Sequence, residues 1–577
     1  MSSILVAAID FGTTYSGWAF SFKGDFHNNP TKVCARNWIG NQLISAKAPT
    51  CVLIEPDGKT LDSFGYKAEN KYADLSEERA HEPWYYFWRF KMMLYDKMKI
   101  QRHVMLEDET GKMLPAKSVF SLAIEFLKKD LLKECHKQLA DDLSEDDIKW
   151  VLTVPAIWND GAKQFMREAA EQAGIPRSQL KIALEPEAAS LYCRYLPVQK
   201  GHEENFLASF EPGTKYIVLD AGGGTIDITV HQVIVDGKLR ELHKASGGAW
   251  GGTMVDKAYE RFLSDIAGPE AFQQFKKEHI DDYIDLFRTF EVKKRETSPG
   301  HLGKVTFRIP PTFVKTIKGA TGLSIKDKIM SSPFNGQVTY VSGKLRVDGQ
   351  VAQSFFKQSV DSIVQHLESL LGERLNKECT AIVMVGGFSE SIILQDAVKC
   401  AFGRRYNVII PEGAGLAVLK GAVIFGHRPS TISERICKYT YGQSVCHETT
   451  LDCNHPPTRI ELIDGKLHCI NIFVKHITIG QTVKLEEEQT EIITNPTYAD
   501  QTTIDRKIYA SKSPDPRLVT EPGCTKIGHF VIPIPDISLG TDRLFGTRFI
   551  FGDTEIAVKS EDKQTGEVQI HSIDFLE

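Results

Sequence analysis

Two stretches of sequence decide the fold: IDFGTTYSGWAF at residues 9–20 and LDAGGGTIDITV at residues 219–230. Each is an apolar run that ends on an aspartate, followed by a turn rich in glycine and threonine and then by a second apolar run. Because the pattern occurs twice, it predicts a duplicated, two-lobed fold in which each half contributes one β-hairpin.

Both turns are suited to binding phosphate. In the second turn, Gly222, Gly223 and Gly224 lack Cβ atoms, so the backbone N–H groups can approach an anion closely. Asp10 and Asp220 end the leading strands and carry the carboxylate oxygens that a hydrated Mg²⁺ prefers. One glycine-rich turn is most often only a turn. A matched pair led by aspartates instead predicts a clamp for a metal-bound polyphosphate.

Other nucleotide-binding motifs are absent from the sequence. There is no G-x-x-x-x-G-K-[ST] loop, and no G-x-G-x-x-G turn followed by an acidic strand end. Dinucleotide chemistry is therefore disfavoured.

Composition sets the broad class. The chain has 577 residues, 42% of them hydrophobic, which suggests roughly four domain-sized units. With 69 basic and 75 acidic side chains, the net charge is −6. This balance gives no electrostatic sign that the protein binds nucleic acid or an anionic membrane. The 11 cysteines form no C-x-x-C pair, which argues against a zinc site and a disulfide framework and favours a reducing compartment. The apolar run Ile4–Ile9 is too short for a secretory signal or a membrane span, so we expect a cytoplasmic protein.

The order of apolar patterns predicts an α/β protein with a β-rich C-terminal part. Strands are expected at Ile4–Ile9, Trp150–Val154, Tyr216–Leu219 and Ala381–Val385, and helices at Leu122–Leu139 and Phe355–Leu371. From about Pro429 the pattern changes to β-branched alternation, as in Ile527–Ile534 and Thr547–Val558. We expect a first lobe at 1–205, a second lobe at 206–425, a linker at 426–440 and a β domain at 441–577.

Five ordered motifs resemble a known family. They are IDFGTTYS, LTVPAIWNDGAKQFMREAAEQAGI at 152–175, LEPEAASLY at 184–192, LDAGGGTID and VMVGGFSES at 383–391. Over about residues 4–425 they are similar to the ATPase module of the seventy-kilodalton heat-shock protein family, and in detail to its heat shock protein 12A-like branch. The resemblance implies an actin-like, duplicated ribonuclease H-like ATPase that binds ATP or ADP with Mg²⁺.

The resemblance also implies a role for individual residues. The metal would be surrounded by Asp10, Asp220 and Asp227, and the catalytic residues would be Lys91, Glu185, Asp220 and Thr225. The nucleotide would be contacted by Asp10, Gly12, Thr13, Thr14, Tyr15, Gly222, Gly223, Gly224, Gly251, Gly252, Glu291, Lys294, Arg295, Gly386 and Gly387. Asp256 would brace the lobes. A surface ion pair on one helix face would also explain Glu291 and Lys294.

Several positions depart from the family pattern. Phe388 and Glu390 stand where the family has a serine and an arginine beside the base, which leaves the selectivity for adenine open. Pro411–Gly415 lacks the acidic residue of the later adenosine motif. Lys181 and Leu184 replace an arginine and an asparagine that help dock J-domain cochaperones, which argues against that partner.

The C-terminal part resembles the family only in its last strands. Residues 532–576 are similar to the closing strands of the peptide-binding β-sandwich, whereas Ile432–Cys437 does not resemble the acidic, leucine-rich linker. The helical lid and the acidic cochaperone tail have no counterpart. We therefore expect a small β-sandwich, similar to a substrate-binding domain but without a lid.

Three functions are compatible with these features. The first is an ATP-binding, ATP-hydrolysing chaperone-like protein whose nucleotide state gates the binding of unidentified client proteins. The second is a nucleotide-sensing scaffold that hydrolyses ATP slowly or not at all. The third is a small-molecule kinase of the sugar-kinase branch, which shares the duplicated hairpins but does not account for the resemblance of the tail to a peptide-binding domain.

Overall fold

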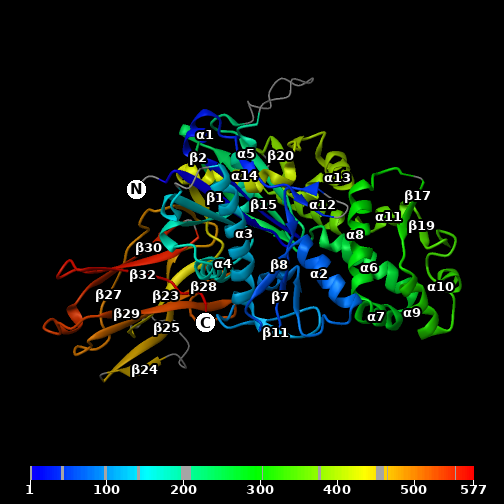
Figure 1. Cartoon of the computed structure of the whole chain (residues 1–577). Helices are drawn as coiled ribbons and strands as arrows, with labels where there is room; N and C mark the ends of the chain where they lie inside the picture. Colours follow the sequence, from blue (N-terminus) through cyan, green and yellow to red (C-terminus); the bar gives the residue numbers. More distant parts are fainter. Residues whose placement is uncertain are drawn as a thin grey trace.

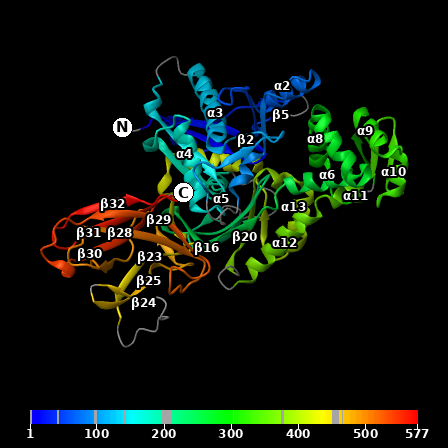
Figure 2. The ribbon, with the colours of Figure 1, turned by 90° about the horizontal axis from the view of Figure 1, so that it is seen from below.

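The fold is built around two large mixed sheets (Figure 1). The computed structural model describes residues 3–40, 44–95, 100–138, 143–196, 210–301, 303–373, 378–449, 460–463, 465–552 and 554–576. Figure 2 shows the β-rich C-terminal part, in orange and red, at one end of the molecule and a group of helices, in green, at the other. The boundary expected between residues 205 and 206 lies outside the described residues.

The first sheet has the strand order β13-β12-β1-β2-β3. Its strands are β1 (Leu5–Phe11), β2 (Tyr15–Phe22), β3 (Cys34–Ala35), β12 (Ile148–Val154) and β13 (Leu180–Leu184), with β6 (Ala48–Pro49) also paired to β2. β1 and β2 form an antiparallel hairpin, while β12 lies parallel to both β1 and β13. β1 is buried along its whole length because the sheet is covered on both faces.

The second sheet repeats this arrangement. Its strands are β14 (Lys215–Ala221), β15 (Ile226–Val233), β16 (Leu239–Gly248), β20 (Ala381–Val385), β21 (Asn407–Ile409), β22 (Ile432–Ile436) and β26 (Thr482–Lys484). In the order β21-β20-β14-β15-β16, β14 and β15 form the hairpin and β20 lies parallel to β14. The duplication predicted from the two hairpin sequences is thus confirmed. β22 lies in the segment expected to be a linker, where it pairs in parallel with β16.

Two helices lie between the sheets, α5 (Glu185–Cys193) and α14 (Ala417–His427). Residues of both helices share one hydrophobic core with Val6 of β1 and Val218 of β14. The helices approach very closely, since a Cβ atom on Gly421 would lie 1.7 Å from the carbonyl oxygen of Ala188. This contact sets how near the two sheets can come.

Helices also cover the outer faces of both sheets. On the first sheet these are α3 (Ala116–Gln138) and α4 (Asp160–Gln172), and on the second α6 (Thr253–Ala267), α12 (Lys357–Gly372) and α13 (Ile392–Phe402). The helices predicted at Leu122–Leu139 and Phe355–Leu371 are confirmed as α3 and α12, except that residue 139 lies outside the described residues.

Smaller elements extend each half. The first half carries the sheet β8-β7-β9, made of β7 (Cys51–Ile54), β8 (Leu61–Phe64) and β9 (Tyr85–Trp88), with α2 (Tyr66–Glu77) against it. The second half carries α7 (Pro269–Glu278), α8 (Ile280–Glu296), α9 (Pro311–Thr321), α10 (Ile325–Ser331), α11 (Gly349–Ser354), β17 (Lys304–Arg308), β18 (Val338–Val341) and β19 (Lys344–Asp348). Tyr86 and Phe87 of the aromatic run 84–88 are core residues.

The C-terminal part contains two further antiparallel sheets. The larger consists of β23 (Thr440–Glu448), β24 (Ile460–Ile463), β25 (Lys466–Ile477), β28 (Thr503–Ser511) and β29 (Cys524–Pro533). The smaller consists of β27 (Ile492–Thr494), β30 (Phe545–Phe551), β31 (Ile556–Asp562) and β32 (Val568–Ser572). Tyr441 and Ile508 of the larger sheet share a core with Phe549 and Val558 of the smaller one.

A polar layer divides the interior between these two sheets. On β28, Arg506 stands between Ile504 and Ile508, which belong to separate hydrophobic clusters, and on β30 Thr547 stands between residues of the same two clusters. Gln443 is fully buried, and among the described residues neither of its amide atoms has a hydrogen-bond partner. Burial lowers the pKa of the Arg506 guanidinium to about 10.

The α5–α14 contact leads to a stability prediction. Gly421→Ala should lower the free energy of unfolding by about 3 kcal/mol or more, because the added methyl group collides with backbone and not with a flexible side chain. Gly319→Ala makes the same change in α9, where a Cβ atom would meet nothing within 4 Å. That variant should gain about 0.5–1 kcal/mol. Urea unfolding measures both, and similar midpoints for the two variants would contradict the prediction.

Candidate nucleotide site

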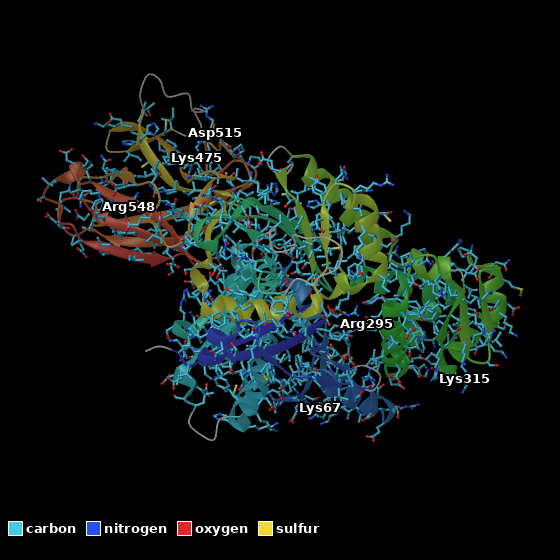
Figure 3. All side chains as sticks on the ribbon, turned by 90° about the horizontal axis from the view of Figure 1, so that it is seen from above. Lys67, Arg295, Lys315, Lys475, Asp515 and Arg548 are labelled. Atoms are coloured by element: carbon cyan, nitrogen blue, oxygen red, sulfur yellow. The ribbon has the colours of Figure 1, made fainter. Side chains whose placement is uncertain are left out.

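A cavity of about 500 Å³ lies between the two halves of the chain. Its size is that of a pocket for a small-molecule ligand or cofactor. All of the predicted site residues except Gly251 and Asp227 line it. Figure 3 shows Arg295, one of the lining residues, near the centre of the molecule, where the blue first half meets the green second half.

The two hairpin turns face each other across this cavity. Gly12, Thr13 and Thr14 connect β1 to β2, and Gly222–Thr225 connects β14 to β15. The turns are nearly in contact, since a Cβ atom on Gly223 would lie 2.0 Å from Thr14 Oγ1. Glycine is therefore required at this position for the turns to approach. The two turns predicted from the sequence therefore lie close together at one cavity.

Asp10 is buried at the end of β1 and is held by two partners. Its carboxylate accepts a hydrogen bond from Thr153 Oγ1 at 2.7 Å and forms an ion pair with Lys47 Nζ at 2.6 Å. Burial opposes ionisation of Asp10, but Lys47 and Thr153 lower its pKa below the ordinary value. Asp10 is therefore a carboxylate, with Lys47 in the position of a counter-ion.

Two further acidic side chains of the cavity, Asp220 and Glu185, lack full compensation. Burial, with the nearby charges of Glu185 and Asp227, raises the pKa of Asp220 well above its usual range. Burial likewise raises the pKa of Glu185 to about 7, although Lys91 opposes this shift. Buried carboxyl groups that crowd together in this way are suited to a divalent cation, which would offset their repulsion.

The residues present fit a Mg²⁺ ion that also binds phosphate. Among the described residues, no group of three or more histidine, cysteine, aspartate or glutamate side chains is arranged to hold a metal ion by itself. Mg²⁺ commonly binds one or two carboxylates and takes its other ligands from phosphates and water. Asp10 and Asp220, which both line the cavity, can supply those carboxylates.

Lys91 lies on the floor of the cavity in a short 3₁₀ helix, Phe90–Leu94. Its side chain is only 2% exposed, and Nζ lies 2.7 Å from Glu185 Oε1 and 5.0 Å from the centre of the Trp158 ring. A buried cation beside a carboxyl group that titrates near neutrality can act in charge stabilisation and proton transfer.

Asp227 and Gly251 lie behind the cavity surface. Asp227 pairs with Asp220 in the β14–β15 ladder and accepts a hydrogen bond at 2.7 Å from the backbone N–H of Ile157. A Cβ atom on Gly251 would lie 2.6 Å from the carbonyl oxygen of Gly222, so this glycine lets the turn before α6 pack on the second hairpin.

Asp256 connects the two halves beside the cavity. Its carboxylate forms ion pairs at 2.7 Å with Arg89 from the first half and with Lys294 of α8. Lys294 also pairs with Glu291 at 2.6 Å, so the ion pair considered from the sequence exists and also lines the cavity. The guanidinium of Arg295 lies 5.5 Å from the centre of the Tyr15 ring.

The far end of the cavity is apolar on one side. Phe388 and Leu416 line it beside Gly386, whose φ of +84° few other residues adopt. A Cβ atom on Gly386 would also lie 2.3 Å from Asp220 Oδ1. The Glu390 carboxylate accepts a hydrogen bond from the backbone N–H of Gly415. This part of the cavity therefore has a partly apolar wall, with Phe388 and Glu390 where the family pattern has a serine and an arginine.

Sequence reasoning missed Lys47 and Arg89 as site residues. Lys47 follows β5 (Ile44–Ser45), and Arg89 follows β9 with a left-handed φ of 53°. Neither belongs to a glycine-rich motif. The signal that was available is chemical: a buried aspartate such as Asp10 needs a cation, and the first lysine or arginine of the chain is Lys23.

Comparison with known proteins agrees with this geometry. The family model described as Hsp70 protein matches residues 89–296. Heat shock 70 kDa protein 12B of Homo sapiens is 35% identical, over 99% of this chain and 91% of the relative. The chain belongs to the Hsp70 family. Another Hsp70 relative, heat shock 70 kDa protein 12A of Mus musculus, is 34% identical over 99% of this chain and 92% of its own length. Chaperone protein dnaK of Cyanidium caldarium is 27% identical over 52% of this chain and 43% of its own length.

Membership of the Hsp70 family confirms the resemblance seen in the five motifs, including the 12A-like branch. It makes the duplicated sheets an Hsp70 actin-like ATPase fold, and the protein an Hsp70-family nucleotide-binding protein. In the part of the chain that the structure describes, no helix has the length and apolar character needed to cross a bilayer.

The Asp256 ion pairs lead to a second prediction. Asp256→Asn should destabilise the nucleotide-free protein by about 3 kcal/mol, because Arg89 and Lys294 lose a shared carboxylate in a buried site. Adding Lys294→Met should recover part of this loss, because only Arg89 is then left without the Asp256 carboxylate.

Urea unfolding provides the measurement. Glu296→Gln is the matched control, because its ion pair with Lys293 lies at the surface and should contribute less than about 1 kcal/mol. If the control and Asp256→Asn unfolded at the same urea concentration, the bracing role of Asp256 would be wrong.

Proposed function

We propose that this protein binds ATP with Mg²⁺ and hydrolyses it, and that its nucleotide state controls the binding of other proteins by the C-terminal β part. The supporting observation is the pair of aspartate-led glycine hairpins that face each other across one cavity, with Lys91, Glu185 and Thr225 on its walls. We place the protein in the cytoplasm.

Each group has a role that follows from its position. The backbone N–H groups of both hairpin turns would bind phosphate oxygens, and Asp10 and Asp220 would hold a Mg²⁺, whose charge would offset that of the phosphates. Asp227, which lies behind the cavity surface, would help to hold the water ligands of that ion. Phosphoryl transfer depends chiefly on positioning and on charge neutralisation, so these contacts supply most of the effect.

The reaction itself uses groups on the cavity floor. Lys91 stabilises the negative charge on the transferred phosphoryl group, and the Thr225 hydroxyl orients it. Glu185, with a pKa of about 7, can accept a proton from the attacking water at a carboxylate oxygen. The apolar wall formed by Phe388 and Leu416 lies against the base. Arg295, Glu291 and Lys294 lie beside it and contact the ribose.

For the C-terminal part we propose a β-sandwich that binds client proteins without a helical lid. Its two sheets share a core, and no α-helix follows α14 in the described residues. When nucleotide closes the two ATPase lobes, the conformational equilibrium of the C-terminal part would shift. The free energy of that shift would equal the difference in nucleotide affinity between the open and the closed lobes. Lys181 and Leu184 argue against a J-domain cochaperone.

A nucleotide-sensing scaffold is the second candidate. Lys91 is held between Glu185 and the Trp158 ring, and the apolar wall lacks the arginine of the family pattern. Both features favour slow turnover.

Calorimetric titration tests the nucleotide site. ATP and ADP should bind in Mg²⁺, and Gly223→Ala should weaken both by at least about tenfold, or about 1.4 kcal/mol, because the methyl group drives the hairpins apart. Replacing Mg²⁺ with EDTA should also weaken ATP binding, since the buried carboxylates then repel the triphosphate. Gly319→Ala serves as the control and should bind as the unsubstituted protein does. The absence of heat from either nucleotide would refute the proposal.

Single-turnover hydrolysis separates an ATPase from a scaffold. Asp10→Asn and Thr225→Ala should each slow phosphate release by about a hundredfold, because each removes an interaction with the transferred group or its metal. Equal, near-zero rates for the unsubstituted protein and for both variants would favour the scaffold. Phosphate appearing on an added sugar or polyol would instead support a kinase.

A further inference from the structure

The nucleotide site is linked to the C-terminal part through one short turn. Residues Pro155–Trp158 follow β12, and the turn is closed by a hydrogen bond from Trp158 N–H to the carbonyl of Pro155. Ala156 and Trp158 are almost fully buried. The turn lies between the floor of the cavity and the connection from β22 to β23.

One side of this turn holds the nucleotide site. The N–H of Ile157 donates to Asp227 Oδ1 at 2.7 Å, and the indole ring of Trp158 lies under the ammonium group of Lys91. Two of the groups assigned to the metal and the phosphates therefore rest on the same four residues.

The other side of the turn is held by Lys438. Its Nζ donates to the carbonyl oxygen of Ala156 at 2.9 Å and to that of Trp158 at 3.0 Å. Burial lowers the pKa of Lys438 to about 7, and the neutral amine keeps the two N–H groups that these bonds require.

The contacts form a continuous chain through one peptide group. The carbonyl of Ala156 and the N–H of Ile157 belong to the same peptide unit, so this unit accepts from Lys438 and donates to Asp227. Hydrogen bonds linked in series polarise and strengthen one another. Losing the bond from Lys438 weakens the bond to Asp227 and frees the turn to rotate.

Neighbouring contacts fix the segment that carries Lys438. Arg435 makes a two-pronged ion pair with Glu187 of α5, and the N–H of Ile436 donates to Glu241 at 2.9 Å. Tyr441 Oη donates to Asp160 at 2.8 Å. Lys438 therefore reaches the turn from a fixed backbone.

We propose that Lys438 is a positioning residue of the nucleotide site, which orients Asp227 through the Ala156–Ile157 peptide and so makes ATP hydrolysis depend on docking of the C-terminal part. The inference rests on the proposed function. It supplies a route between the two parts that does not need the leucine-rich linker of the family pattern.

Single-turnover hydrolysis and ATP titration of the full chain test this together. Lys438→Met should slow hydrolysis about tenfold, as expected when a supporting hydrogen bond behind a metal site is lost, while ATP affinity changes much less. Lys438→Arg, which retains N–H donors, should hydrolyse ATP at a rate closer to that of the unsubstituted protein.

Two control variants make the test specific. Lys475→Met removes a lysine from β25 that pairs with Asp515, and Figure 3 shows both residues on the C-terminal part, far from Arg295. Tyr441→Phe removes a different bond between the C-terminal part and α4. Lys475→Met should hydrolyse ATP as the unsubstituted protein does, and Tyr441→Phe, which keeps both bonds from Lys438 to the turn, should lose much less rate than Lys438→Met. If Tyr441→Phe lost as much rate as Lys438→Met, or if Lys438→Met kept the full rate, the proposal would be overturned.

A second readout needs no nucleotide. Hydrogen exchange of residues 155–158, followed by mass spectrometry, should be faster in Lys438→Met than in Lys475→Met, because the Ile157 N–H is then less firmly bonded. Unchanged exchange would overturn the proposal. If the unsubstituted protein bound no ATP, the proposed function would fail, and the exchange experiment would still decide whether Lys438 fixes the turn.

Discussion

The close approach of the two hairpin turns is the contact on which the rest of the site depends. Thr14 and Gly223 leave no room for a Cβ atom between them, so the turns of both halves present their N–H groups to one small volume. Asp10 and Asp220 arrive there because each ends the strand that leads into its turn. At a different separation, each turn would lie apart with one buried carboxylate and the N–H groups of that turn alone.

This separation is set far from the turns, between α5 and α14. Gly421 packs on the backbone of Ala188, and the paired helices fill the space between the inner faces of both sheets. α5 begins at Glu185, so the helix that spaces the sheets also delivers a carboxyl group to the cavity. Packing in the core and chemistry in the cavity are therefore adjusted by the same element.

The parts of the structure that could be predicted are those encoded locally. The hairpins, the strand ends and the duplication follow from short motifs around Asp10 and Asp220, because alternation and glycine placement act over a few residues. Lys47, Arg89 and Lys438 could not be predicted. Each reaches its partner only through tertiary folding, and nothing adjacent in sequence marks a lysine that is to meet a carbonyl about 280 residues earlier. The strand β22 could not be predicted either, because its pairing with β16 depends on the second sheet already being formed.

The polar layer around Arg506 has a consequence for how the C-terminal part unfolds. An apolar interior resists separation because every newly wetted surface costs free energy, whereas the Arg506 guanidinium and the Gln443 amide gain water when they are exposed. Under heat, denaturant or mechanical load, the two sheets should therefore separate first at this polar layer. The polar layer would allow the two sheets of the C-terminal part to separate and to pack together again while the ATPase half stays folded.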